Sequence, residues 1–326
     1  MPEQILENIY RLPVPLEGNP LKELNTYLIK GRDRNLLLDT GFRSNSCREA
    51  LFRQLAELGV HPGEMDVLLT HMHSDHSGLC AEAAGQTGTI YICGLDNHML
   101  RSQKEWEDYW NETQRRIVAQ GFPLQQLEPL WKNDPFAELD PPRNTPHISL
   151  AHGDVLEAGG HRLQAVHTPG HTPGHLCFWM EREGVLFLGD HVLFDISPNI
   201  TAWNEMPDAL GSYLQSLRNI REYPAALALP AHRGRGELAA RVDQLLEHHA
   251  RRLDETLRIL RQQPEQTAFQ LAGQMTWRIR ARSWAEFPLT QKWFAVGETV
   301  AHLEHLVQLG ALRADTVDGV VRYRVP

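Results

Sequence analysis

Three histidines and one aspartate fall within six residues of this 326-residue chain, in the run HMHSDH at positions 71–76. The apolar run Asp66–Thr70, which directly precedes them, predicts a buried strand. Because residues two apart on an extended segment project to the same side, His71 and His73 can bind one ion. Asp75 and His76 follow where the chain turns into a helix, and they can face a second ion. Neutral imidazoles and carboxylates suit zinc, iron or manganese.

Three further elements place an imidazole or a carboxylate at the end of a predicted strand. His171 follows a strand after a turn that Pro-Gly pairs make tight. Asp190 ends one apolar strand, and His232 follows another. A single histidine in such a place is usually structural, but three such elements in series favour one shared metal site. We interpret other histidines, such as His161 and His249, as surface or loop residues.

The strands and helices that must position these side chains follow from the hydrophobic pattern. Short β-prone segments predict strands at Glu7–Pro15, Asn25–Lys30, Arg34–Asp39, Asp66–Thr70, Thr89–Cys93, His147–Leu150, Arg162–His167, Leu176–Glu181, Val185–Leu188 and Ala226–Leu229. Amphipathic spacing predicts helices at Asn45–Gly59, Asp208–Tyr223 and Glu237–Gln262. This alternation predicts an α/β fold in which a sheet is layered against helices.

Two stretches differ from the alternating pattern. Residues 96–145 are charged, contain tryptophan and end in a proline-rich loop, which predicts a helical insertion that lies over the metal site as a lid. Pro264 marks a predicted boundary between a catalytic domain, residues 1–263, and a second domain, residues 264–326. The second domain contains helical segments, including Glu298–Leu309, and then a β-prone tail that turns at Asp318-Gly319. Helices followed by a two-stranded wing are typical of a winged-helix domain.

In these motifs, taken in order, the sequence resembles the metallo-β-lactamase superfamily, and within it the glyoxalase II-like hydrolases. The resemblance covers roughly residues 7–250 and implies a four-layer αββα sandwich with two metal ions at one edge of the sheets. By motif, the first ion would be held by His71, His73 and His171, the second by Asp75, His76 and His232, and both by Asp190. The resemblance also implies that Asp39 and His175 support these ligands from behind. The C-terminal piece resembles the winged-helix domain that is appended to some members.

The resemblance implies a hydrolytic function. Two divalent ions, zinc preferred and iron or manganese as alternatives, would share a water and lower its pKa toward ~7. The resulting bridging hydroxide would attack a thioester or a related ester or lactone bond, as in hydroxyacylglutathione hydrolases, while Asp75 orients it and accepts a proton. A phosphodiesterase or ribonuclease with the same dinuclear site is one alternative, because some winged-helix relatives cut RNA. A non-catalytic ligand sensor or interaction protein on the same scaffold is the other.

Composition limits the partners and the compartment. The 32 basic and 41 acidic residues give a net charge of −9, which disfavours a nucleic-acid partner. We expect the C-terminal module to pack on the core, to cover the active site or to form a homodimer, in preference to binding nucleic acid. No apolar run approaches the ~18 residues of a membrane span, and the chain begins without a signal-peptide pattern. With four cysteines and no Cys-x-x-Cys pair, we expect a cytoplasmic protein without membrane contact that acts on a small-molecule ester or thioester.

Overall fold

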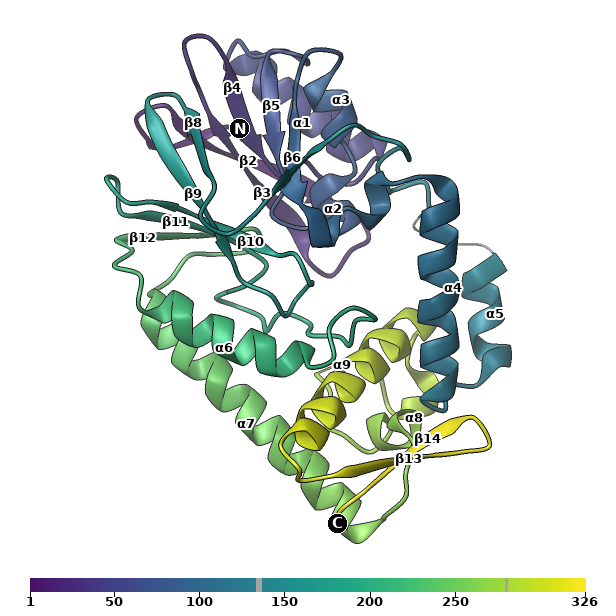
Figure 1. Cartoon of the computed structure of the whole chain (residues 1–326). Coiled ribbons are helices and arrows are strands. Elements are labelled where there is room, and N and C mark those ends of the chain that lie inside the picture. Colours follow the sequence, from purple (N-terminus) through teal and green to yellow (C-terminus); the bar gives the residue numbers. More distant parts are fainter. Residues whose placement is uncertain (133–136, 279–280) are drawn as a thin grey trace.

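The computed structural model describes residues 1–132, 137–278 and 281–326, and the side chains of residues 130–132 lie outside that description (Figure 1). Its strands are β1 (Glu3–Leu6), β2 (Ile9–Leu16), β3 (Lys22–Ile29), β4 (Asn35–Leu38), β5 (Met65–Leu68), β6 (Ile90–Cys93), β7 (Ile148–Leu150), β8 (Val155–Ala158), β9 (His161–His167), β10 (Leu176–Met180), β11 (Val185–Gly189), β12 (Leu227–Pro230), β13 (Arg313–Val317) and β14 (Val320–Arg324). Its α-helices are α1 (Asn45–Glu57), α2 (Ser74–Ser77), α3 (Cys80–Ala84), α4 (Gln103–Ala119), α5 (Leu124–Lys132), α6 (Ala209–Arg221), α7 (Leu238–Gln262), α8 (Ala268–Ala272) and α9 (Leu289–Gln308). Short 3-10 helices are η1 (Gly94–Asp96), η2 (His98–Leu100) and η3 (Trp284–Glu286).

Two sheets form the centre of the molecule. The first has the strand order β1-β2-β3-β4-β5-β6-β7, in which the pairs from β1 to β4 are antiparallel and those from β4 to β7 are parallel. The second has the order β12-β11-β10-β9-β8 and is antiparallel except for the β11–β12 pair. Because parallel neighbours need a crossover, helices separate them in the chain. The predicted ligands before residue 100 follow the parallel strand β5, and Asp190 and His232 follow the parallel pair β11 and β12, whereas His171 follows the antiparallel strand β9.

The two sheets pack face to face through one apolar core. Leu38 and Leu68 of the first sheet lie in the same cluster as Phe178 and Phe187 of the second. On the outer faces, α1 and α3 cover the first sheet, and α6 and α7 cover the second (Figure 1). Alternating side chains of each strand therefore serve two different cores. This four-layer αββα sandwich confirms the predicted fold class.

The chain after α7 forms a separate small core with α8, α9 and the β13–β14 pair. Its buried residues include Leu271 of α8, Val300 of α9 and Tyr323 of β14. The insertion packs on this C-terminal segment, because Ile117 of α4 belongs to the same core. Residues 133–136 of the predicted insertion loop lie outside the described residues. The β13–β14 turn falls at the predicted position, whereas the winged-helix interpretation, the boundary at Pro264 and the lid stay predictions.

Several elements differ from their predictions. Strand β8 was not predicted, because it lies at a sheet edge and its residues are exposed or half-buried, so that it lacks an apolar pattern. Strand β1 is a second short edge strand of this kind. The prediction that His161 and His249 are surface residues is wrong. His161 is buried beside Glu183, at 2.8 Å, and His249 is buried 3.2 Å from the Nε2 atom of His302.

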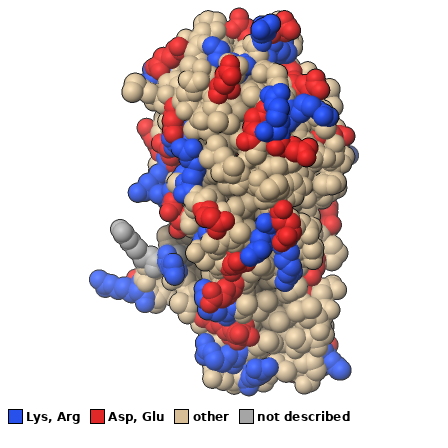
Figure 2. Space-filling view, turned by 90° about the vertical axis from the view of Figure 1, so that its left-hand side faces the viewer, with Lys and Arg blue, Asp and Glu red and all other residues tan. Residues whose placement is uncertain are grey.

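The face of the molecule drawn in Figure 2 carries both signs of charge. Lysine and arginine side chains alternate with aspartate and glutamate side chains, so the described residues form no continuous basic surface on this face. Within the described ranges, none of the helices combines the length and the apolar character that a membrane span requires.

Candidate metal centre

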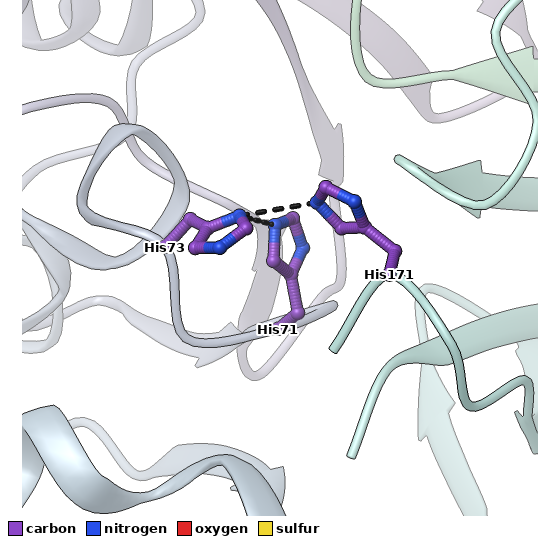
Figure 3. Close-up of side chains that lie close together, drawn as sticks. All are labelled: His71, His73 and His171. Atoms are coloured by element: carbon purple, nitrogen blue, oxygen red, sulfur yellow. Dashed lines mark hydrogen bonds between the residues drawn. The ribbon is translucent and has the colours of Figure 1, made fainter. Parts of the chain in front are cut away.

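Three imidazole nitrogens from two loops meet at one point (Figure 3). His71 and His73 lie on the loop after β5, and His171 lies on the loop between β9 and β10. The Nδ1 atom of His73 lies 2.9 Å from Nε2 of His71 and 3.1 Å from Nε2 of His171. One Nδ1 holds a single proton or a single lone pair, so at most one of these contacts is a well-formed hydrogen bond. Spacings near these values are instead expected around one ion with Zn–N bonds of ~2.0–2.1 Å.

Hydrogen bonds behind two of the rings determine which nitrogen is free to bind an ion. The Nδ1–H group of His171 donates to the main-chain carbonyl of Asn199 at 2.8 Å. The hydroxyl of Thr70 donates to Oδ2 of Asp39 at 2.8 Å, so it accepts from Nδ1–H of His71 at 3.0 Å. In both rings Nε2 therefore carries the lone pair, and it faces the other two histidines.

Asp75, His76 and His232 form a second group. Asp75 and His76 lie in the short helix α2, and His232 follows β12. The Nδ1–H group of His232 donates to the main-chain carbonyl of Glu23 at 2.8 Å. The Nε2 atoms of His76 and His232 are buried and have no hydrogen-bond partner among the described residues. The nearest oxygen of Asp75, Oδ2, lies 3.8 Å from Nε2 of His76 and 3.4 Å from Nε2 of His232. Buried polar atoms normally have partners, and a cation between these atoms would supply one.

Asp190 lies between the two groups and faces both. Its Oδ2 atom lies 3.6 Å from Nε2 of His171 in the first group. Its Oδ1 atom lies 3.3 Å from Nε2 of His232 and 3.6 Å from Nε2 of His76 in the second. Oδ1 is buried and lacks a hydrogen-bond partner in the described part of the chain. One oxygen toward each group is an arrangement that suits a ligand shared by two ions.

Burial determines the charge of the first group. It lowers the pKa of His71 and of His171 below the usual value and lowers the pKa of His73 to about 3. Taking an imidazolium out of water is unfavourable, and no carboxylate near these rings is strong enough to reverse the shift. The three rings are therefore neutral at neutral pH, the form that binds metal ions.

Neighbouring carboxylates determine the charge of the second group. Burial by itself would lower the pKa of His76 and His232, but Asp39 beside His76 and Asp190 beside His232 outweigh it. The pKa of His76 is raised well above its usual value, and that of His232 is raised to about 10. Burial conversely favours a higher pKa for Asp75, and the two histidines lower it to about 2. The second group is therefore a buried cluster of opposite charges in which divalent ions can replace the histidine protons.

Two glycines let the loops approach the site closely. Gly189 has a φ of +51°, and a Cβ at this position would lie 2.6 Å from Nε2 of His175. Gly170 has a φ of +141°, and its Cβ would lie 2.3 Å from the Cβ of Tyr213 on α6. Only glycine fits such positions. Asp190 and His171 thus reach the site because the residue before each has no side chain.

Asp39 and His175, which we predicted to support the ligands, contact the site from behind. Oδ1 of Asp39 accepts from the main-chain N–H of Thr70 at 2.9 Å, and Oδ2 accepts from Nδ1–H of His76 at 2.8 Å. Nε2 of His175 accepts from the main-chain N–H of Asp190 at 3.1 Å. The structure therefore brings together all nine residues that the sequence analysis singled out.

Two residues around the centre were missed by the sequence analysis. Asp96, just after β6, accepts from the main-chain N–H of Gly174 at 2.6 Å, from that of Met72 at 3.3 Å and from the hydroxyl of Thr172. It thereby joins the loop of the first two histidines to the loop of the third. An acidic residue at the end of a parallel strand, as at Asp190, is the signal that could have identified it. The second residue, Asn199, holds His171 through its main-chain carbonyl, which leaves no signal in the side-chain pattern.

Comparison with known proteins adds to this geometry. Residues 22–232 match the metallo-beta-lactamase superfamily, and residues 282–326 match the metallo-beta-lactamase-like C-terminal domain. The chain belongs to the metallo-beta-lactamase superfamily. The first match contains all seven candidate ligands, and the second contains α9, β13 and β14. The resemblance to the superfamily that was inferred from the motifs is therefore confirmed.

Three similar proteins illustrate the range of the superfamily. A metallo-beta-lactamase family protein from Thermus thermophilus is 30% identical with a TM-score of 0.82, and the match covers 99% of this chain and 100% of that chain. Lactamase-like protein adaB of Aspergillus niger is 29% identical over 79% of this chain and 65% of its own length. The atrochrysone carboxyl ACP thioesterase of Aspergillus fumigatus is 26% identical over 76% of this chain and 46% of its own length. The chain thus spans less than two thirds of these two curated relatives.

Proposed function

We propose that this chain is a hydrolase in which two neighbouring metal ions promote cleavage of a thioester or a related ester or lactone bond. The position of Asp190 carries the proposal, because its two oxygens lie 3.3–3.6 Å from nitrogens of two separate groups. Ions that share one carboxylate can lie ~3.5–4 Å apart and act on the same substrate. Membership of a superfamily of hydrolases supports the same conclusion.

The side chains present fit divalent ions. One ion would be held by His71, His73 and His171, the other by Asp75, His76 and His232, and Asp190 would be shared. Imidazole and carboxylate donors suit zinc, with iron and manganese as the alternatives. When bound, such ions polarise a carbonyl oxygen and lower the pKa of a bound water toward ~7.

Asp75 is the residue that we propose as proton acceptor. Its Oδ2 atom faces His76 and His232, which leaves its other oxygen for the substrate side. A pKa of about 2 keeps the carboxylate ionised at neutral pH. His73 is half-buried, whereas the other two histidines of its group are buried, so substrate would approach from the side of His73. The ring of Trp203 lies 6.1 Å from that of His73 and would pack against the substrate there.

A thioester is the substrate class that we prefer. One similar protein is named an ACP thioesterase, and the motifs resemble those of glyoxalase II-like hydrolases. A thiol has a pKa of ~8.5 and leaves readily as a thiolate. Hydrolysis of a thioester therefore needs activation of the carbonyl more than it needs an acid that protonates the leaving group. The site offers cation ligands and the carboxylate of Asp75, which suits that requirement.

The cellular setting is also a proposal. All four cysteines are buried and free, which fits a reducing compartment such as the cytoplasm. The homodimer stays a prediction.

A substrate panel on metal-quantified protein tests the proposed function. The zinc-loaded protein would be incubated with a simple thioester, a lactone and bis-nitrophenyl phosphate, and Asp190→Ala would serve as the matched control. We expect thioester turnover in the wild type and a parallel loss of bound zinc and turnover in the variant. Turnover of the phosphodiester alone would favour a ribonuclease, and bound metal without any turnover would favour a sensor. Either result would contradict the proposal.

A further inference from the structure

The segment 199–203 contacts His171 at two places. The main-chain carbonyl of Asn199 accepts from Nδ1–H of His171 at 2.8 Å. The indole Nε1–H of Trp203 donates to the main-chain carbonyl of His171 at 3.1 Å. One contact orients the imidazole and the other holds the backbone that carries it. The position of segment 199–203 therefore determines where Nε2 of His171 points.

The same segment is held on its other side by α9 of the C-terminal segment. The amide Nδ2–H of Asn199 donates to Oε2 of Glu298 at 3.3 Å. The other oxygen of Glu298 lies 3.6 Å from Nε of Arg252 on α7. Arg252 is itself fixed, because its guanidinium donates to Thr276 at 2.9 Å and stacks on Trp277 at 4.3 Å. A partly buried chain of polar contacts thus leads from the C-terminal segment to a candidate metal ligand.

Gly297 brings the backbone of α9 into direct contact with the segment. A Cβ at this position would lie 2.2 Å from Oγ1 of Thr201. Glycine inside a helix costs ~1 kcal/mol relative to alanine, so its presence here fits a need for close approach. Ala202, one residue on, packs against both the core under the second sheet and the C-terminal core. The segment is therefore enclosed between the metal centre and α9.

We propose that α9 orients a metal ligand: Glu298 and Gly297 hold segment 199–203, and that segment holds the His171 imidazole toward the first ion. The proposal rests on the proposed function, because it takes His171 as a ligand. A carbonyl that accepts from the outer nitrogen of a metal-bound histidine fixes both tautomer and direction, and loss of such contacts typically costs 10–100-fold in metal affinity. Glu298 and Gly297 are positioning residues, since neither touches the site itself.

Metal binding by the full chain tests this without relying on turnover. Zn²⁺ affinity of the metal-free protein would be measured against a chromophoric chelator, and Co²⁺ absorption would report the coordination. Glu298→Ala and Asn199→Ala should each weaken binding by about tenfold or more. The side chains of Glu298 and Asn199 act through the one hydrogen bond between them. The Zn²⁺ affinity of the double variant should therefore be no lower than that of the single variant with the lower affinity.

Gly297→Ala offers a rescue experiment. Alanine favours the helix, yet its Cβ must displace Thr201, so we expect weaker Zn²⁺ binding and an altered Co²⁺ spectrum. Thr201→Ala removes the Oγ1 atom in the way, so the double variant should recover most of the affinity. Val300→Ala is the matched control, because Val300 lies on the same helix but packs in the C-terminal core. It should lower stability and leave metal affinity within about threefold.

Three outcomes would overturn the proposal. Wild-type affinity in Glu298→Ala and Gly297→Ala would show that α9 does not orient the ligand. Equal losses in Val300→Ala would show that any damage to the C-terminal core acts in the same way. A wild-type protein that binds neither Zn²⁺ nor Co²⁺ would refute the metal centre, and this inference with it. The first two outcomes would refute only this inference and leave the proposed function standing.

Discussion

Replacing Asp96 by alanine should loosen both histidine loops at once. Asp96 is fully buried, and three donors meet its carboxyl group: the N–H groups of Gly174 and Met72 and the hydroxyl of Thr172. The hydroxyl can rotate to another acceptor, but the two main-chain N–H groups cannot. A buried donor left without an acceptor costs ~1–3 kcal/mol. We therefore expect Asp96→Ala to lose about 2–6 kcal/mol of unfolding free energy.

Urea unfolding of the metal-free protein measures this loss, and two variants calibrate it. Asp96→Asn keeps an oxygen for the N–H of Gly174 but not for that of Met72, so it should lose about half as much. Asp208→Asn is the control, because Asp208 caps α6 through Oδ1, which accepts from the N–H of Gly211 at 2.8 Å. The same Oδ1 atom lies 3.1 Å from Nδ1 of His305, so an asparagine can keep both contacts through one oxygen. Asparagine caps a helix as well as aspartate does, so we expect a change within ~0.5 kcal/mol.

Asp96→Ala should also weaken metal binding. If Asp96 holds the two loops together, Asp96→Ala should weaken Zn²⁺ binding about 10–100-fold, measured by chelator competition under conditions where the variant is folded. A variant as stable as the wild type would refute the reasoning. So would a less stable variant with unchanged Zn²⁺ affinity, because the loops would then keep their positions without Asp96.

Three further measurements test the charges of the centre. Burial raises the pKa of Asp96 to about 7, above the ~3.9 of an unfolded aspartate. Its contribution to stability is therefore full below pH ~4 and is lost as the pH rises through the folded pKa. The urea-measured gap between wild type and Asp96→Ala should narrow from pH ~4.5 to ~7.5, and a constant gap would contradict the shift. Elemental analysis should find about two ions per wild-type chain and fewer in Asp190→Ala. An unchanged count would argue against a shared ligand. Because the pKa of His232 is raised to about 10, a second ion must displace its proton, so apparent Zn²⁺ affinity should rise by up to about tenfold per pH unit from pH ~6.5 to ~8.5; a flat profile would exclude this proton as the competitor.

The seven candidate ligands could be predicted because their signal is local. Each lies on the segment that follows a strand, including the short helix α2, and strand ends can be recognised from apolar runs of four or five residues. The ligands follow β5 of the first sheet and β9, β11 and β12 of the second, so they converge because the two sheets pack face to face. The same local patterns predicted an α/β fold with a sheet layered against helices, whereas the four-layer sandwich came from the resemblance to the superfamily.

The residues that hold the ligands were not predictable in this way. Asp96 bonds to Gly174 across 78 positions, and Asn199 bonds to Glu298 across 99. Neither contact follows from the periodicity of one element, because each depends on how two loops or two cores pack. The edge strands β1 and β8 were missed for a related reason: they are short and have exposed or half-buried residues, so burial leaves little pattern in them.

The two ligand groups are held in place by different kinds of partner residue, and these partners lie in different parts of the chain. In the second group the partners are charged, and Asp39, Asp75 and Asp190 all stand in recognisable motifs. In the first group the rings are neutral, so charge cannot orient them, and the outer nitrogen of His171 relies on a carbonyl that α9 holds through Glu298. A chain with the same seven ligands but a different C-terminal segment should therefore keep the charge of the second group and lose the orientation of His171.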